Sequence, residues 1–179
     1  MSDHPGFFAY FAKKWEVSNA HLHKFPFLDL FSVPDEAKGS FEFVVCSDVL
    51  EHVAGSPRLA LEGSWALLRP GGSAVVTVPI ADSIATVEHY PGLVEFDIEE
   101  GPSVRWKDVN GVERVDDNPE MHGGDGLVLT FRRYGKADFK DLLSSAGFTG
   151  IQYGPVNRLL GVGALPANEE SGVFVLWKA

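Results

Sequence analysis

Four polar side chains follow directly on one apolar run, and their types are those of acid–base chemistry and ligand binding. The run is Phe41 to Cys46, and after it come Ser47, Asp48, Glu51 and His52. A continuous apolar run of this length predicts a strand buried on both faces of a sheet. Open α/β sheets bind ligands at the carboxyl ends of their strands. We therefore expect Cys46, Ser47 and Asp48 to line a pocket there.

Each of these polar residues also has an ordinary structural role. Asp48 is suited to cap the amino end of a helix, and Glu51 three residues later would complete a capping box. His52 is a candidate general base, because histidine titrates near neutral pH. Packing and loop hydrogen bonding are its alternative roles.

A second histidine with possible proton-transfer chemistry lies far downstream. His122 is followed by Gly123 and Gly124, which leave its ring accessible, so it is a candidate general base. A plain loop histidine is the alternative. No metal site is expected, because the single cysteine offers no zinc cluster and no further ligand has helpful spacing from His21 and His23.

The elements that must position these residues alternate between strand and helix. Pro57 suits a first helical turn, apolar residues then recur at helical spacing, and the glycines after Pro70 stop the helix. A second strand is expected over residues 73–79. Near the carboxyl terminus a helix over 136–146 precedes strands at 149–153 and 172–178.

Between these parts, one segment predicts a β-hairpin. Residues 103–109 alternate weakly, Asn110-Gly111 follows, and Val112 to Val115 resume the alternation. Asn-Gly between alternating runs is a strong hairpin signal. Trp106 would be the apolar anchor of this hairpin, which could serve as a lid or as a dimer contact.

Several linked pieces of the chain resemble the second half of a class I S-adenosylmethionine-dependent methyltransferase of the small-molecule type, called type 11. They are Phe41-Glu42, Val49 to Val53 (VLEHV), Leu68 to Gly72 (LRPGG) and Val78-Pro79. The resemblance covers about residues 29–178. It implies an α/β, Rossmann-like sheet with an antiparallel last strand, here truncated at the front and carrying the hairpin as an insertion.

The resemblance also assigns roles to single residues. Asp29 and Leu30 open a stretch similar to the family's D-x-x-x-L-P-x-x-x-G-S-F-D, so Asp29 is expected to bind the adenine amino group and Leu30 to lie beside the ring. The alternative for Asp29 is a loop residue capping a turn. Cys46, Ser47 and Asp48 would line the cofactor pocket. His122, in a P-E-x-H-G-G stretch found in a subset of these enzymes, would take the proton that a nucleophile loses on methylation.

One family feature is missing, and it bears on the cofactor. Only Gly6 and Gly39 precede residue 41, so the glycine-rich GxGxG loop that lets the backbone approach S-adenosylmethionine is absent. Weak or absent cofactor binding is therefore expected. A methyltransferase acting on a small molecule is the first hypothesis, and a non-catalytic pseudo-methyltransferase used as an interaction or assembly module is the second.

Composition narrows the class of protein. The 179 residues are 45% apolar, which permits one domain with a real core, and the net charge of −10 argues against a nucleic-acid backbone as partner. A local basic spot at Arg132-Arg133 is conceivable. The single cysteine indicates a reducing compartment, and no signal peptide or membrane span is evident, so a cytoplasmic location is expected.

We expect a single domain over 1–179, divided into four parts. Residues 1–28 form an amino-terminal helical segment, 29–80 and 127–179 form the core, and 81–126 form an insertion or lid. Without the family's front strands, the first strand would expose an apolar edge. Either the amino-terminal segment or a second copy of the chain, forming a homodimer, would have to cover that edge.

Overall fold

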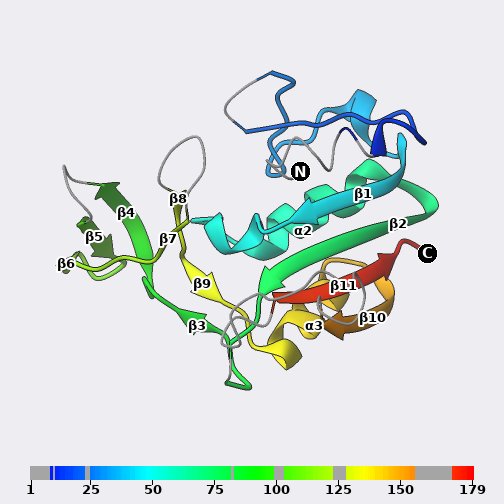
Figure 1. The fold of residues 1–179 in the computed structure, drawn as a ribbon. Coiled ribbons are helices and arrows are strands. Elements are labelled where there is room, and N and C mark those ends of the chain that lie inside the picture. Colours follow the sequence, from blue (N-terminus) through cyan, green and yellow to red (C-terminus); the bar gives the residue numbers. More distant parts are fainter. Residues whose placement is uncertain are drawn as a thin grey trace.

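The computed structural model describes residues 9, 11–22, 25–81, 83–98, 103–122, 128–155 and 171–179. Its elements, in chain order, are the 3₁₀ helix η1 (Asp35–Ala37), β1 (Phe41–Ser47), the 3₁₀ helix η2 (Leu50–His52), α2 (Pro57–Leu67), β2 (Leu68–Pro79), β3 (Val87–Glu88), β4 (Leu93–Ile98), β5 (Val104–Asp108), β6 (Glu113–Asp116), β7 (Met121–His122), β8 (Val128–Leu129), β9 (Arg132–Arg133), α3 (Lys136–Ser145), β10 (Thr149–Pro155) and β11 (Ser171–Trp177). Figure 1 shows their arrangement.

The central sheet has four strands in the order β1-β2-β11-β10. β1 and β2 are parallel, as their connection through α2 requires, whereas β11 is antiparallel to both β2 and β10. The expected helices and strands of the core are confirmed, including the antiparallel last strand. β2 is longer than expected, because residues 68–72 are extended and join it through an irregularity in its register with β1.

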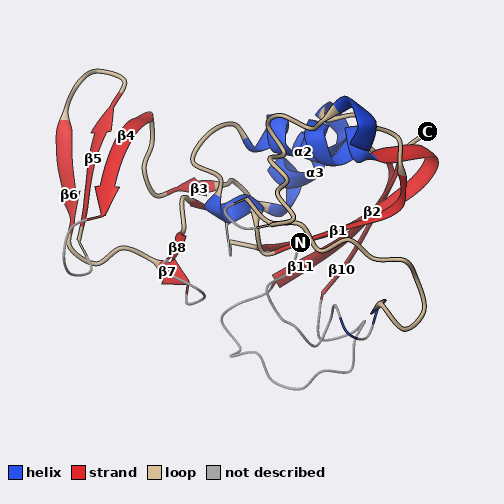
Figure 2. Ribbon diagram, turned by 90° about the horizontal axis from the view of Figure 1, so that it is seen from above, coloured by secondary structure: helices blue, strands red, loops and turns tan. Residues whose placement is uncertain are grey.

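Both helices pack on the same face of this sheet, as Figure 2 shows. Their apolar sides and the inward residues of the strands form one core, which includes Leu61, Phe139, Leu143, Val76 and Phe174. Gly147 follows α3 at φ +98°, a conformation that favours glycine and ends the helix as expected. The core therefore lies between one face of the sheet and one layer of two helices.

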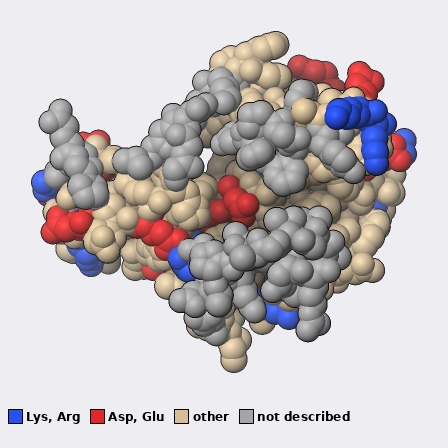
Figure 3. All heavy atoms as spheres, viewed as in Figure 1, with Lys and Arg blue, Asp and Glu red and all other residues tan. Residues whose placement is uncertain are grey.

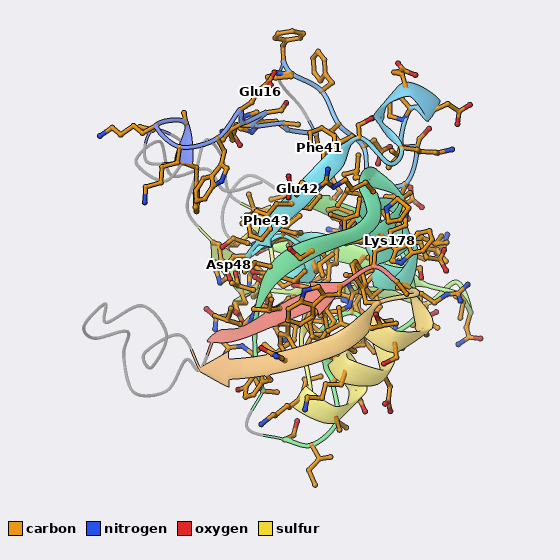
Figure 4. All side chains as sticks on the ribbon, turned by 90° about the vertical axis from the view of Figure 1, so that its right-hand side faces the viewer. Glu16, Phe41, Glu42, Phe43, Asp48 and Lys178 are labelled. Atoms are coloured by element: carbon orange, nitrogen blue, oxygen red, sulfur yellow. The ribbon has the colours of Figure 1, made fainter. Side chains whose placement is uncertain are left out.

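The expectation that β1 is buried on both faces is wrong. Only Cys46 of this strand is fully buried, and the Phe43 side chain is 47% exposed. The reason is that α2 and α3 cover one face only. In the described part of the chain no strand pairs with β1 on the side away from β2. Figure 4 shows Phe43 between Phe41 and Asp48 along this strand.

The segment after β2 builds a separate three-stranded sheet, β4-β5-β6, here called the outer sheet. The predicted hairpin is confirmed as β5 and β6, with Gly111 at φ +78° in its turn. Trp106 is buried as its anchor, packed with Tyr90 and Phe131. β4, the third strand, was not predicted. Figure 1 shows the outer sheet standing apart from the central one, joined to it through β3, β7, β8 and β9.

None of the helices in the described ranges is long and apolar enough to cross a membrane. Of the predicted amino-terminal helical segment, residues 1–8, 10, 23 and 24 lie outside the described residues. Of that segment, the rings of Phe11 and Trp15 lie 5.7 Å apart, and Trp15 is 59% exposed.

Candidate functional site

A cluster of hydroxyl and carboxylate groups lies at the carboxyl ends of β1 and β2. Ser47 Oγ and Thr77 Oγ1 are 2.8 Å apart, and both donate to the Asp48 carboxylate at 3.1 Å. The parallel pairing of β1 with β2 sets Ser47 opposite Thr77 and so creates the cluster. Because Asp48 is exposed, its carboxylate is an accessible acceptor for a ligand's N–H or O–H groups.

The backbone at Asp48 is unusual, since this residue has φ +50° and is the only non-glycine residue with positive φ in the described ranges. Its N–H donates to the Thr77 carbonyl and hydroxyl oxygens, which hold the bend in place. The predicted capping box is wrong. η2 begins after Val49 without any side-chain cap, because the Asp48 carboxylate is occupied by Ser47 and Thr77. Such outliers cluster at functional sites.

The Glu51 side chain is completely buried, and neither of its carboxylate oxygens has a hydrogen-bond partner in the described part of the chain. Burial raises the pKa of Glu51 to about 8. Native proteins rarely leave a buried carboxyl group without partners, because the desolvation cost is not offset. Glu51 is therefore a residue whose position demands an explanation other than stability.

The side chains of Arg132, on β9, and of Tyr134, which follows it, hold the η2 loop that carries Glu51. Tyr134 Oη donates to the Leu50 carbonyl at 3.0 Å. Arg132 donates to the carbonyls of Val53 at 2.6 Å and Gly55 at 3.3 Å, and its Nε contacts Glu88 at 2.8 Å. The suggested basic spot at Arg132-Arg133 is wrong for Arg132, which is buried and ion-paired.

His52 lies next to Glu51, and its tautomer follows from its hydrogen bond. Its Nδ1 lies 2.9 Å from the Leu129 carbonyl oxygen, which can only accept, so Nδ1 carries the proton. Nε2 then presents a lone pair, 3.8 Å from Glu51 Oε1. Burial lowers the pKa of His52, which keeps the ring neutral.

The ring of His122, on β7, packs against the ring of His52. The two rings are edge to face with centroids 5.0 Å apart. The His122 side chain is 40% exposed against 14% for His52, and its Nε2 lies 3.6 Å from Glu120 Oε1. Glu120 is in turn bound by two nitrogens of Arg133, at 3.0 and 3.1 Å. The structure thus brings together the two histidines that the sequence singled out, although 70 positions separate them.

The other predicted site residues lie as follows. Asp29 Oδ1 accepts from the Phe31 N–H at 2.8 Å, which is the turn geometry given above as the alternative. Leu30 is buried in the core, where its carbonyl lies against Gly63 of α2. The Cys46 thiol is also fully buried in the core, so only its backbone faces the strand end. In the described ranges, Asp29 makes no hydrogen bond or ion pair with Ser47 or Asp48.

The donor and acceptor types at the strand end fit the polar groups of a nucleoside cofactor. Adenine amino, ribose hydroxyl and ammonium groups are all donors, and the Asp48 carboxylate is an acceptor. Gly39 is not part of a cofactor loop at that end, because it precedes β1, where its N–H donates to Ala66. Figure 3 shows acidic side chains over the outer sheet and a further group in the middle of this face.

Sequence reasoning missed Glu51, Thr77 and Arg132 as site residues. The one signal for Glu51 was its place in the VLEHV turn, but we interpreted Glu51 as part of a capping box. Thr77 could have been found from strand pairing, since residues that end neighbouring parallel strands meet at one edge. Nothing in the sequence indicates that Arg132 is buried while Arg133 is not.

Comparisons with known proteins agree with this architecture. A sequence model of the family described as "Methyltransferase domain" matches residues 10–153. The CurJ carbon methyltransferase has a TM-score of 0.50 at 18% identity, with 86% of this chain and 34% of that one covered. The 1,6-didemethyltoxoflavin-N1-methyltransferase of Burkholderia thailandensis has a TM-score of 0.48 at 16% identity, covering 98% and 58%. No curated protein matches.

A methyltransferase of Clostridium acetobutylicum, dependent on S-adenosylmethionine, has a TM-score of 0.49 at 11% identity. It is covered over 63% of its length, so this chain spans less than two thirds of each of the three structures. The likeness to the CurJ domain supports the Rossmann-like fold.

Proposed function

The chain belongs to the methyltransferase-domain family that matches residues 10–153, and we propose that it transfers a methyl group from S-adenosylmethionine to a small molecule. The observation that carries the proposal is the polar centre at the carboxyl end of β1. There an exposed carboxylate at positive φ, Asp48, lies on the same loop as His52, whose ring contacts that of His122 on β7. Cofactor groups and a proton acceptor are needed side by side in this chemistry.

We assign the cofactor to the strand end. When bound, S-adenosylmethionine supplies a methyl group already made electrophilic by its sulfonium. Asp48, Ser47 and Thr77 would accept or donate hydrogen bonds to its polar groups, Cys46 would contribute backbone only, and Asp29 would release Phe31 to accept from the adenine amino group, with Leu30 behind it. Because no glycine-rich loop precedes β1 in the sequence, we expect this binding to be weak.

We assign proton transfer to the histidine pair. His122 is the more exposed ring and would take the nucleophile's proton, whereas His52 holds a fixed tautomer through Leu129 and orients its partner. General-base catalysis typically contributes about 10²- to 10⁴-fold. We therefore expect His122→Ala to lower kcat by that factor with little change in cofactor affinity, and His21→Ala, in the amino-terminal segment, to serve as the control.

The experiment for the function is calorimetric titration of S-adenosylmethionine into the purified chain. We expect a dissociation constant weaker than about 1 μM, a further loss of about 1–3 kcal/mol in Asp29→Ala, where a polar partner is removed, and a loss in Asp48→Ala. Asp35→Ala, an exposed aspartate bonded to Lys38 at the other end of β1, should bind as the parent does.

Other outcomes would redirect the assignment. If Asp29→Ala bound S-adenosylmethionine as tightly as the parent chain but were less stable, the turn would be the only role of Asp29. No binding even at millimolar cofactor would favour the second hypothesis, a non-catalytic module that uses the sheet as an interface.

We also propose a homodimer that covers the exposed aromatic rings near β1. Phe43 and Trp15 are 47% and 59% exposed, and exposed aromatic rings are often buried where two copies of a chain meet. Light scattering across a dilution series tests this proposal, and a monomer at all concentrations would exclude it. The chain has one cysteine and that cysteine is buried, which fits our expectation of a cytoplasmic location.

A further inference from the structure

Three side chains that could ligate a metal converge between η2 and β7. They are Glu51, His52 and His122, and one ligand atom from each lies within 4.8 Å of the other two. The set brings two imidazole nitrogens and one carboxylate oxygen, which is the donor combination of open zinc sites. Zinc ligands in a tetrahedron lie closer together than this, so the side chains would have to approach by about an ångström.

The buried carboxylate is the independent observation that points to a ligand. Glu51 has no exposed side-chain area, and both of its oxygens lack partners in the described ranges. Oε1 nevertheless lies 3.8 Å from His52 Nε2. A cation between them would satisfy the carboxylate, which no donor among the described residues contacts.

The hydrogen bond behind His52 has the arrangement that metal ligands use. Metal-binding histidines donate their other ring N–H to a carbonyl or carboxylate, which fixes the tautomer and aims the free nitrogen. His52 does this through Nδ1 to the Leu129 carbonyl. The 40% exposed side chain of His122 provides the side from which an ion and a further ligand would enter.

We propose that Glu51, His52 and His122 form a binding site for one divalent transition-metal ion of the zinc class, with at least one coordination position open toward His122. Imidazole ligands favour such ions over Mg²⁺ and Ca²⁺, which prefer oxygen.

This inference goes beyond the proposed function and changes one part of it. A lone pair of His122 cannot hold an ion and accept a proton at the same time. With the ion bound, a coordinated hydroxyl or water loses its proton more readily, because the cation stabilises the anion. Only this effect on the proton of the nucleophile rests on the proposed methyl transfer; the metal site itself does not.

The test is a titration of Zn²⁺ into the chain after treatment with a chelator, by calorimetry. We expect one ion per chain with a dissociation constant of about 1 μM or tighter. Glu51→Gln keeps the shape of the side chain, and His122→Ala changes a partly exposed residue, so both should fold. Each should bind Zn²⁺ at least about tenfold more weakly, since even residues behind the ligands contribute that much.

His89→Ala is the matched control. His89 also binds a carbonyl through Nδ1, that of Thr130 at 3.1 Å, and its Nε2 lies 3.8 Å from Glu120, but it does not converge on Glu51. Its removal should leave Zn²⁺ affinity unchanged. Binding that is absent from the parent chain, or that survives Glu51→Gln, overturns the proposal.

A measurement on the unaltered chain does not depend on whether the variants fold. At one equivalent, paramagnetic Co²⁺ should broaden or shift the ring proton signals of His52 and His122 more strongly than those of His89, which lies on the other side of Glu120. Selective effects on other histidines would place the ion elsewhere and contradict the assignment.

The two proposals can fail separately. Glu51→Gln should weaken Zn²⁺ binding and leave S-adenosylmethionine affinity as in the parent chain, because Glu51 is fully buried and takes no part in the assigned cofactor contacts.

Discussion

The two ends of the central sheet differ in how completely their polar groups are paired. At the amino end of β1, Lys178 Nζ donates to the Leu68 carbonyl at 2.7 Å and to the Trp65 carbonyl at 3.2 Å, and it lies 3.7 Å from the Trp65 ring centroid. Gly71 and Gly72 exchange backbone hydrogen bonds with the same lysine. Within the described ranges, Trp65 Nε1 is the one buried side-chain atom at this end without a hydrogen-bond partner. Figure 4 shows Lys178 at the opposite end from Asp48.

At the carboxyl end, the pattern is reversed. Asp48 has a positive φ, and the buried Glu51 carboxylate has no hydrogen-bond partner among the residues that the structure describes, yet the loop carrying them is anchored by Arg132. One end of the sheet is therefore built for stability, whereas the other holds an unfavourable arrangement in place. Proteins keep such arrangements mainly where binding or catalysis uses them. Four substitutions or measurements would break or sharpen this contrast.

The largest effect is expected from Arg132→Met. The change takes a partner from Glu88, which is 43% exposed, and removes the donors that hold the Val53 and Gly55 carbonyls. Each buried acceptor left without a donor costs about 1–3 kcal/mol. Urea unfolding should show that loss. Arg58→Met, which breaks an exposed pair with Glu62 on α2, should cost about 0.5 kcal/mol or less. Equal losses would mean that the loop is not anchored as described.

A smaller loss is expected from Lys178→Met at the paired end. Two carbonyls lose their donor, which costs about 1–3 kcal/mol of unfolding free energy. Affinity for S-adenosylmethionine should stay as in the parent chain, because Lys178 lies at the end away from Asp48. Lys38→Met, which breaks an exposed pair, is the stability control. A change in cofactor affinity would contradict the separation of the two ends.

Glu51→Met should change stability in the opposite direction. A methionine of similar volume removes a buried carboxyl group that has no partner, so the free energy of unfolding of the metal-free chain should rise by about 1 kcal/mol. Binding of Zn²⁺ should be lost. A destabilisation of similar size would show instead that Glu51 makes a stabilising contact beyond those of the described residues.

The smallest effect concerns the reactivity of Cys46. Burial raises the pKa of its thiol to about 12, so at pH 8 only about one thiol in ten thousand is a thiolate. A thiol reagent should therefore modify the folded chain about a thousandfold more slowly than the unfolded one. Fast modification that S-adenosylmethionine blocks would place the thiol in the cofactor pocket.

Much of the fold was predictable from the sequence, because it rests on local patterns. The run before Cys46, the helix from Pro57, the Asn110-Gly111 turn and Gly147 each act through backbone preferences that neighbouring residues do not override. The exposure of Phe43 was not predictable. It depends on which faces of the sheet the helices cover, and the residues of the strand alone do not determine that.

The site was only partly predictable, for a different reason. His52 and His122 were identified singly, but their contact depends on β7 folding back against η2 across 70 positions. The spacing from Asp48 to Glu51 matches a capping box, and only the bonds from Ser47 and Thr77 show why the cap does not form. Pairing between distant segments decides these roles, so sequence spacing alone misassigned them.

The most direct test of the account is to follow backbone amide signals by NMR while S-adenosylmethionine is added to the chain. We expect the signals of residues 47–53 and of Thr77 to move at submillimolar to millimolar cofactor, while Gly39, Gly71 and Lys178 stay in place. Unmoved signals at residues 47–53, or shifts confined to the Lys178 end, would contradict the claim that the carboxyl end of β1 is the functional end.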